Sequence, residues 1–216
     1  MKFAPEGYPF FAFFGGITVL SFLAGGPWIA LVPFLLTLFM GYFFRDPERS
    51  IPGGEEAFVS PADGRIIQIR PVEEAQYLKG RAVEISIFMS PLNVHVNRAP
   101  CDGVVEAVVH SPGKFLSAFK PEASLCNENI VMLLKGKECR VLVRQVAGAI
   151  ARRAVCRVRA GHSLKKGERY GIIKFSSRLD VFLPENTVIT VQVGDKVRAG
   201  ETILGHLKKG ENSGSA

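Results

Sequence analysis

Three polar residues that could together activate a hydroxyl group lie on separate segments of the sequence. Asp63 is in "SPADGRI", His95 is in "SIFMSPLNVHVNRAP" and Ser177 is in "KFSSRLD". An imidazole can take the proton of a serine hydroxyl, and a carboxylate can fix the tautomer of that imidazole. The sequence therefore contains the parts of an activated serine. Because the G-x-S-x-G elbow is absent, an ordinary α/β-hydrolase is not predicted.

Each of these residues also has a structural interpretation. An Asp before a Gly is common in turns. His95 alternates with Val94 and Val96, so it faces away from these valines and could be an ordinary hydrogen-bonded histidine. Ser177 and its neighbour Ser176 could be plain strand serines. The chemical interpretation requires that the three segments meet in the fold.

The charge balance of the chain favours an acidic partner. Among 216 residues the formal net charge is +7. A long apolar segment makes anionic lipid the favoured partner, because basic residues beside a membrane are attracted to its headgroups. RGG repeats, RNP motifs and C-x-x-C spacings are absent, so no nucleic acid is expected. Free thiols and no metal site are expected, since the cysteines have no paired spacing: Cys101, Cys126, Cys139 and Cys156.

An uncharged run from Tyr8 to Phe44 predicts a membrane-associating segment over residues 1–45. One spanning helix needs about 20 apolar residues, and this run is nearly twice as long. "AGGPW" divides it near the middle, which favours two short helices in a hairpin over a cleaved signal peptide. Lys2 precedes the run and Arg45 follows it. By the positive-inside rule, we expect both ends, and the rest of the chain, on the cytoplasmic side of the cell membrane.

Residues 46–216 predict a mainly β domain. Short β-rich runs such as "RAVEISIF", "CRVLVRQVAG" and "TVITVQVG" are bounded by turn residues, which is typical of a barrel or sandwich. The stretches at 158–171 and 191–205 share the pattern V-x-x-G-x-x-[LV]-x-x-G-E, which resembles turns of biotinyl and lipoyl carrier domains. Neither repeat offers the exposed lysine context that a carrier needs, and the likeness concerns fold alone.

Six motifs in order identify a resemblance to phosphatidylserine decarboxylase proenzymes of the short, prokaryotic type. They are "FFRDPER", "SPADGRI", "FMSPLNVHVNRAP", "GKFLSAFKPEAS" with a following "NE", "AGAIARR" and "RYGIIKFSSRLDVFLP". Together they cover residues 43–184.

The resemblance implies an enzyme that is made as one inactive chain and cuts itself before a serine. By position this serine is Ser177, so a β chain of residues 1–176 and an α chain of residues 177–216 are expected. Ser177 would become a covalent pyruvoyl group, an electron sink for the loss of CO2 from phosphatidylserine. His95 and Asp63 are the candidates for proton transfer, and the product would be phosphatidylethanolamine.

A lipid substrate gives the cations of the sequence a candidate role. Lys114, Lys120 and Arg98, with Arg152 as a further candidate, could bind the lipid phosphate; a solvated basic face is the alternative. The substrate could also be another serine phospholipid, such as archaetidylserine. A rival from a different class is a non-enzymatic, membrane-anchored carrier or adaptor module. A homo-oligomer is compatible with the sequence.

Two positions depart from the pattern of the family. Ser176 stands where these proteins usually have glycine before the cleaved bond, and a Cβ in a backbone conformation that requires glycine costs about 1 kcal/mol or more. Self-cleavage could therefore be slower. Longer relatives have a second histidine at the position of Arg98, so His95 would have to serve both self-cleavage and decarboxylation.

Overall fold

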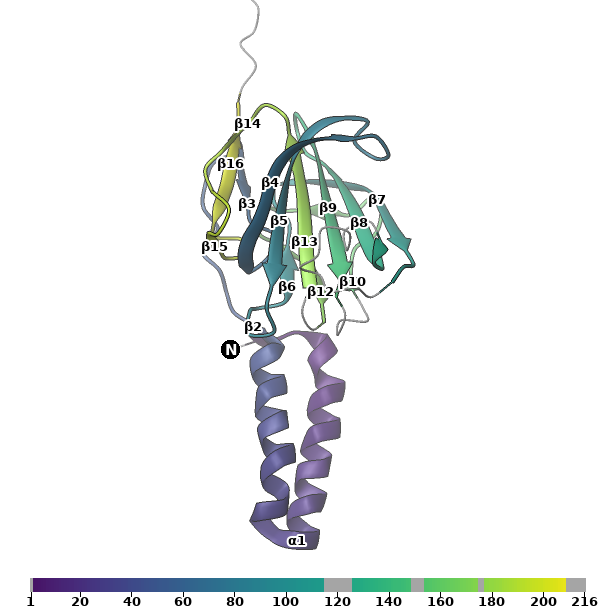
Figure 1. Ribbon diagram of the computed structural model, residues 1–216, viewed down its shortest axis with the longest axis vertical. Coiled ribbons are helices and arrows are strands. Elements are labelled where there is room, and N and C mark those ends of the chain that lie inside the picture. Colours follow the sequence, from purple (N-terminus) through teal and green to yellow (C-terminus); the bar gives the residue numbers. More distant parts are fainter. Residues whose placement is uncertain (1, 115–125, 149–153, 175–176, 209–216) are drawn as a thin grey trace, which may run out of the picture.

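The computed structural model describes residues 2–114, 126–148, 154–174 and 177–208. In these parts a curled β domain carries an apolar helical stalk at one end (Figure 1). The prediction of a mainly β chain with an N-terminal helical hairpin is confirmed.

The hairpin consists of α1 (Tyr8–Phe43), which follows the short 3-10 helix η1 (Pro5–Gly7). Gly26 breaks α1 with φ 77° and ψ −169°, a conformation that favours glycine, and Pro27 begins the returning arm. The two arms run antiparallel (Figure 1), and the hydroxyl oxygens of Thr18 and Thr37 lie 3.3 Å apart between them. The segment Pro5–Phe43 is long and apolar enough to cross a membrane.

Eight antiparallel strands form the main sheet, in the order β11-β7-β8-β9-β13-β5-β4-β15. β13 lies between β5 and β9, so backbone hydrogen bonds hold it on both sides. The strands are β4 (Gly64–Glu74), β5 (Gly80–Met89), β7 (Gly103–Ser111), β8 (Asn129–Lys135), β9 (Arg140–Ala147), β11 (Ser163–Leu164), β13 (Ser177–Pro184) and β15 (Lys196–Val197).

Three smaller sheets complete the domain, in the orders β1-β2, β10-β12-β6 and β14-β16-β3. Their strands are β1 (Lys2–Phe3), β2 (Arg45–Asp46), β3 (Ala57–Val59), β6 (Val96–Arg98), β10 (Ala154–Cys156), β12 (Arg169–Ile173), β14 (Thr187–Ile189) and β16 (Ile203–Leu207).

The main core lies between the main sheet and the smaller sheets. Leu179, Val181 and Leu183 of β13 point into it, as expected for alternate residues of a strand. Tyr170 of β12 and Leu204 of β16 pack there from the other side. Ser177 continues the same alternation, so its side chain belongs to the core face.

The two predicted repeats have matching backbone conformations. Gly161 and Gly167 of the first have φ of 89° and 77°, and Gly194 and Gly200 of the second have φ of 101° and 78°. The short strand that follows the first glycine pairs with the main sheet in each repeat, β11 with β7 and β15 with β4. The repeated sequence therefore builds two equivalent turns.

Ion pairs fix the link between the hairpin and the domain. Asp46 accepts from buried Arg98 at 3.3 Å and pairs with Arg169 at 2.6 Å. At the start of the hairpin, Glu6 pairs with Arg157 at 2.6 Å. Because both arms are attached at their base, the hairpin has a defined position on the β domain.

Candidate active site

Ser177 is the first residue of β13 and is fully buried. It lies opposite Met89 of β5 and Ala147 of β9. Its hydroxyl points to the Met89 thioether, with Oγ 3.5 Å from Sδ. A thioether is a weak acceptor and cannot take a proton at neutral pH, so this contact holds the hydroxyl without activating it.

His95 lies immediately before β6 and is also fully buried. Its Nδ1 is 3.0 Å from the carbonyl oxygen of Asn93. Because a carbonyl only accepts, Nδ1 must carry the proton, which leaves Nε2 as a lone-pair acceptor. Nε2 has no hydrogen-bond partner in the described structure. Burial, and secondarily the charge of Arg45, lowers the pKa of His95 to about 4, so the imidazole is neutral at pH 7.

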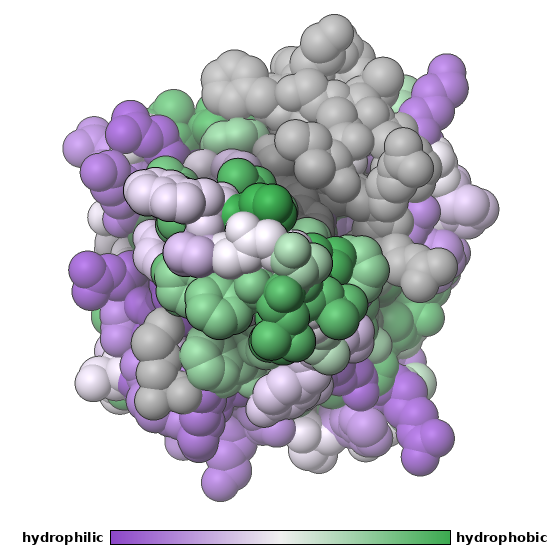
Figure 2. All heavy atoms as spheres, turned by 90° about the horizontal axis from the view of Figure 1, so that it is seen from below, coloured by the Kyte–Doolittle hydropathy of each residue, from purple (hydrophilic) through white to green (hydrophobic). Residues whose placement is uncertain are grey.

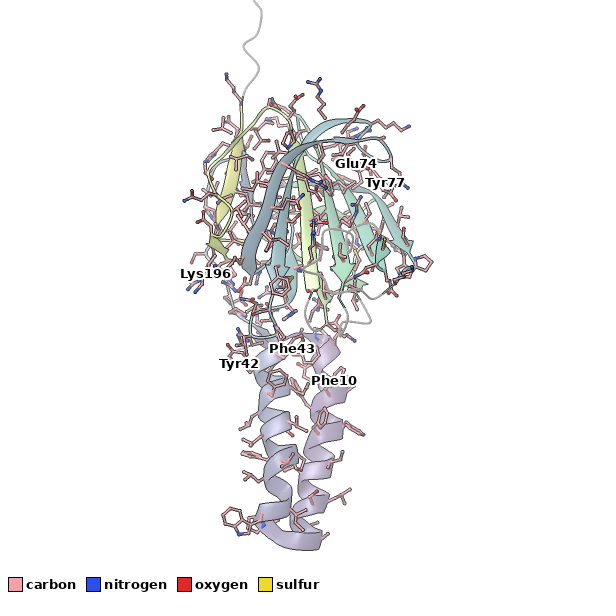
Figure 3. The ribbon with its side chains drawn as sticks, in the orientation of Figure 1. Phe10, Tyr42, Phe43, Glu74, Tyr77 and Lys196 are labelled. Atoms are coloured by element: carbon pink, nitrogen blue, oxygen red, sulfur yellow. The ribbon has the colours of Figure 1, made fainter. Side chains whose placement is uncertain are left out.

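The face of the His95 ring contacts the hairpin. The ring centroids of His95 and Phe43 are 4.2 Å apart, with an interplanar angle of 31°. Phe43 is the last residue of α1, and it lies where the hairpin meets the β domain (Figure 3). The imidazole is therefore at the boundary between the apolar stalk and the β domain.

His95 and Ser177 lie at the same end of the β domain. The backbone N–H of Ile173, at the end of β12, donates to the carbonyl oxygen of His95 at 3.3 Å. Ile173 precedes Ser177 by four residues, and β13 begins at the hairpin end of the domain (Figure 1). Among the described contacts, no hydrogen bond joins the two side chains directly.

In the described structure, the hydrogen bonds of the Asp63 carboxylate go to Arg49 and Ala199, and none goes to His95. Its carboxylate accepts two hydrogen bonds from Arg49, at 3.0 and 2.8 Å, and one from the backbone N–H of Ala199 at 2.7 Å. Asp102, in the related "APCDG" sequence, accepts from the backbone N–H of Lys166 at 2.6 Å. A hydrogen bond from a backbone N–H to an Asp carboxylate thus recurs at Asp102, and the carbonyl of Asn93 fixes the His95 tautomer.

The predicted phosphate ligands have different environments. Arg98 is buried, and its guanidinium donates to the Gly167 carbonyl, the Pro47 carbonyl and Asp46. It is therefore a structural arginine that holds the link after the hairpin. Lys114 is exposed. Lys120, Arg152 and Ser176 lie outside the described residues.

A pair of buried amides near Ser177 was not predicted from the sequence. Gln145 of β9 donates from Nε2 to Asn97 Oδ1 at 2.8 Å, and Asn97 Nδ2 points to Met89 Sδ at 3.9 Å. Ser177 and Asn97 therefore share one weak acceptor. The signal in the sequence was a polar residue inside each of two apolar strands, in "NVHVNR" and "VLVRQVAG".

The described residues contain no group of three or more His, Cys, Asp or Glu side chains that could hold a metal ion. The four cysteines are free thiols, as expected. Cys101 is buried, and burial raises its pKa above the ordinary thiol value, which makes it unreactive.

Comparison with known proteins assigns the chain to a family. The phosphatidylserine decarboxylase family profile matches residues 36–205. Proteins named phosphatidylserine decarboxylase proenzyme from Carboxydothermus hydrogenoformans and Syntrophus aciditrophicus are each 48% identical, over 94% of this chain and 95% and 96% of their own lengths. The protein of that name from Desulfotalea psychrophila is 44% identical over 94% of this chain and 96% of its own length.

These matches, on a mainly β domain with an apolar hairpin, define an enzyme of the decarboxylase class. The chain belongs to the phosphatidylserine decarboxylase family.

Proposed function

We propose that this chain cuts itself between residues 176 and 177 and then converts phosphatidylserine to phosphatidylethanolamine. The observation that carries the proposal is the position of Ser177 at the start of a buried central strand, at the same end of the β domain as the neutral His95, in a chain of this family. Relatives named as proenzymes support a precursor that is processed.

In the first step of self-cleavage, Ser177 Oγ attacks the carbonyl carbon of residue 176. The hydroxyl proton passes to a base, for which we assign His95 Nε2, and from it to the leaving nitrogen of Ser177 as the peptide C–N bond breaks, which leaves an ester and a free amine. Removal of the Ser177 Cα proton then breaks the Cβ–O bond and releases the 1–176 chain as a carboxylate. The remaining dehydroalanine adds water and loses ammonia, which leaves a pyruvoyl group at residue 177.

The surroundings of residue 177 suit such a group. The Asn97 amide has a thioether as its hydrogen-bond acceptor at 3.9 Å, and a carbonyl oxygen would be a better one. Gln145 fixes the orientation of this amide. A bound pyruvoyl group supplies the electron sink that decarboxylation needs. Asn97 would then hold the group, and His95 would carry protons to and from the substrate.

A membrane position for this site follows from the hairpin. Seen from the hairpin side, apolar atoms fill the centre of the molecule and hydrophilic side chains surround them (Figure 2). We place the hairpin in the bilayer and the β domain on the cytoplasmic side, with residues 1–45 as the membrane segment and 46–216 as the catalytic domain. The substrate headgroup would then lie at the level of His95.

For the lipid phosphate, Lys120 and the exposed Lys114 remain candidates. Arg98 is not available for this role, because its guanidinium already binds Asp46 and two carbonyl groups inside the protein. Lys174 is a further candidate: it precedes Ser177 by three residues, and its Nζ lies 5.8 Å from the centre of the Phe10 ring at the hairpin base.

The direct test is a cleavage assay on the purified full chain, with Ser177→Ala and Ser176→Gly variants. We expect two fragments from the parent, no cleavage in Ser177→Ala, and faster cleavage in Ser176→Gly. Cleavage at the same bond in Ser177→Ala would refute the choice of serine. Assays of the cleaved protein with phosphatidylserine and with archaetidylserine separate the two substrates that share this headgroup.

A further inference from the structure

The hairpin does more in this structure than attach the domain to a membrane. Its base packs into an apolar cluster with the segment that carries His95. The cluster joins residues of the hairpin base to residues of β6 and β12: Ala4, Met40, Phe43, Phe44, Val94, Val96 and Ile172, with Phe10, Phe11, Phe14, Phe39 and Val155 packed at its margin.

Phe43 is the member of this cluster that touches the imidazole. Its side chain is fully buried, although most large side chains of α1 are exposed. The contact at 4.2 Å between centroids covers one face of the His95 ring, while Asn93 binds its Nδ1 edge. Ring packing and one hydrogen bond together leave Nε2 as the unpartnered edge of the imidazole.

The backbone around Phe43 is held in place independently of the ring contact. Phe44 accepts from the backbone N–H of Ala4 at 2.8 Å. Arg45 donates to the carbonyl of Tyr42 at 2.6 Å and to the carbonyl of Leu92 at 2.8 Å, which ties the end of the hairpin to the loop before His95. These hydrogen bonds connect the backbone next to Phe43 to Ala4 and to the loop before His95, and so they fix the position of Phe43 relative to His95.

We propose that Phe43 is a positioning residue for His95, and that the base of the hairpin forms one wall of the active site. This inference rests on the proposed role of His95 in proton transfer. It assigns the hairpin two separable functions: residues along the stalk associate with lipid, and its last turn holds the imidazole in the orientation that the chemistry requires.

The two functions can be tested separately, because the hairpin has exposed phenylalanines as well as the buried Phe43. Phe13 is 62% exposed on the first arm of the hairpin. Its ring contacts Phe14 at the margin of the cluster, at 5.2 Å between centroids, but Phe13 is not itself a member of the cluster. Phe13→Ala is therefore the matched control for Phe43→Ala.

The experiment uses the full chain in the Ser176→Gly background, reconstituted in vesicles that contain phosphatidylserine. Phe43→Ala, Phe43→Tyr and Phe13→Ala are compared for the rate of self-cleavage, for flotation with the vesicles, and for modification of His95 by diethyl pyrocarbonate, read by peptide mass spectrometry. In Phe43→Ala we expect cleavage to slow by about 10- to 100-fold and His95 modification to rise about tenfold, because a misplaced catalytic group loses rate on this scale.

Flotation should be unchanged in every variant, and Phe43→Tyr, which keeps the ring, should restore most of the cleavage rate. Phe13→Ala should match the background in all three measurements. Cleavage and His95 modification at background levels in Phe43→Ala would overturn the inference. If Phe43→Ala fails to fold by circular dichroism, Phe43→Leu takes its place, and normal cleavage in that variant would overturn the inference equally.

The readouts distinguish failure of this inference from failure of the proposed function. Absence of cleavage in the Ser176→Gly background itself would contradict the proposed function. Modification of His95 would still report whether Phe43 covers the imidazole, because it does not depend on turnover.

Discussion

At the scale of single residues, the environment of His95 keeps its imidazole neutral and leaves the Nε2 lone pair able to accept a proton. The Asn93 carbonyl holds the proton on Nδ1, and burial keeps the pKa of the ring near 4. A buried neutral imidazole with an unpartnered Nε2 is costly to keep unless that atom is used. The same burial makes the stability of the precursor depend on pH.

His95 should therefore weaken the fold as the pH falls. Its pKa is about 4 in the folded chain and 6.5 in the unfolded chain, so between these values the unfolded state binds a proton that the folded state does not. From pH 7 to pH 4 the free energy of unfolding should fall by about 3 kcal/mol through this residue. The measurement is the apparent Tm against pH in detergent, for the uncleaved Ser177→Ala chain with His95 and with His95→Gln.

The difference between these two curves isolates His95 from the other acid-sensitive groups. Parallel curves with and without His95 would show that the imidazole is not buried in the way described.

At the scale of elements, β13 explains how a cut chain could stay assembled. The strand is hydrogen-bonded to β5 and β9 along its length, and a bond cut before Ser177 removes none of these contacts. Behind it, buried Arg178 pairs with Asp180 at 2.5 Å and donates to Ser86 at 2.7 Å. The first charged residues of the expected α chain are thus anchored inside the domain.

The α chain should accordingly remain bound to the β chain after cleavage. Both fragments should elute together in size-exclusion chromatography in detergent and separate only in denaturant. Arg178→Met should weaken the folded state by about 3 kcal/mol or more, because it removes the cation from a buried ion pair. Loss of the small fragment from the cleaved parent under native conditions would contradict this view of β13.

The link between the hairpin and the domain is the second element with a testable role. Arg49 and Asp63 have side chains that are only 8% and 12% exposed, and Arg49 also pairs with Glu201 at 3.2 Å. Arg49→Ala and Asp63→Ala should each destabilise the fold by about 3 kcal/mol, with a double variant that is far from additive. Lys137→Ala, which breaks a fully exposed ion pair with Glu55, should cost less than about 1 kcal/mol.

Comparison of Arg49→Ala with Asp63→Asn decides between two roles for Asp63, as a structural carboxylate of the link or as a group in proton transfer. If the carboxylate holds the link, Arg49→Ala and Asp63→Asn should reduce stability and cleavage together. Intact cleavage in Arg49→Ala, combined with complete loss in Asp63→Asn, would instead return Asp63 to proton transfer.

The hairpin and the turns of the two repeats could be predicted, because a short continuous stretch of sequence specifies each of them. The uncharged run with Gly26 and Pro27 at its centre specifies a helical hairpin, and the spaced glycines of the two repeats specify matching turns. The partners of buried polar groups could not be predicted in this way. Asp63 and Arg98 carry residue types common in active sites, but they bind link residues that are distant in sequence, and only the packed fold shows this. Phe43 is part of the "FFRDPER" motif, but nothing in this sequence pattern indicated that its ring packs against His95.

At the scale of the whole molecule, the parts form one arrangement in which the apolar hairpin, His95 and the start of β13 meet at one end of the β domain (Figure 1). A lipid headgroup at the membrane surface could reach this end without leaving the bilayer. The arrangement would place the proposed reactive serine at the end of the domain that carries the apolar hairpin.

The central claim is that Ser177 becomes the reactive group of a self-processed enzyme. Its most direct measurement is the intact mass of every fragment of the purified protein, with fragment sequencing to identify the new N-terminus. The account predicts a fragment of residues 177–216 that begins with a pyruvoyl group, and a second fragment that ends at residue 176. An uncut chain in both the parent and the Ser176→Gly variant, or a new N-terminus at any other residue, would contradict it.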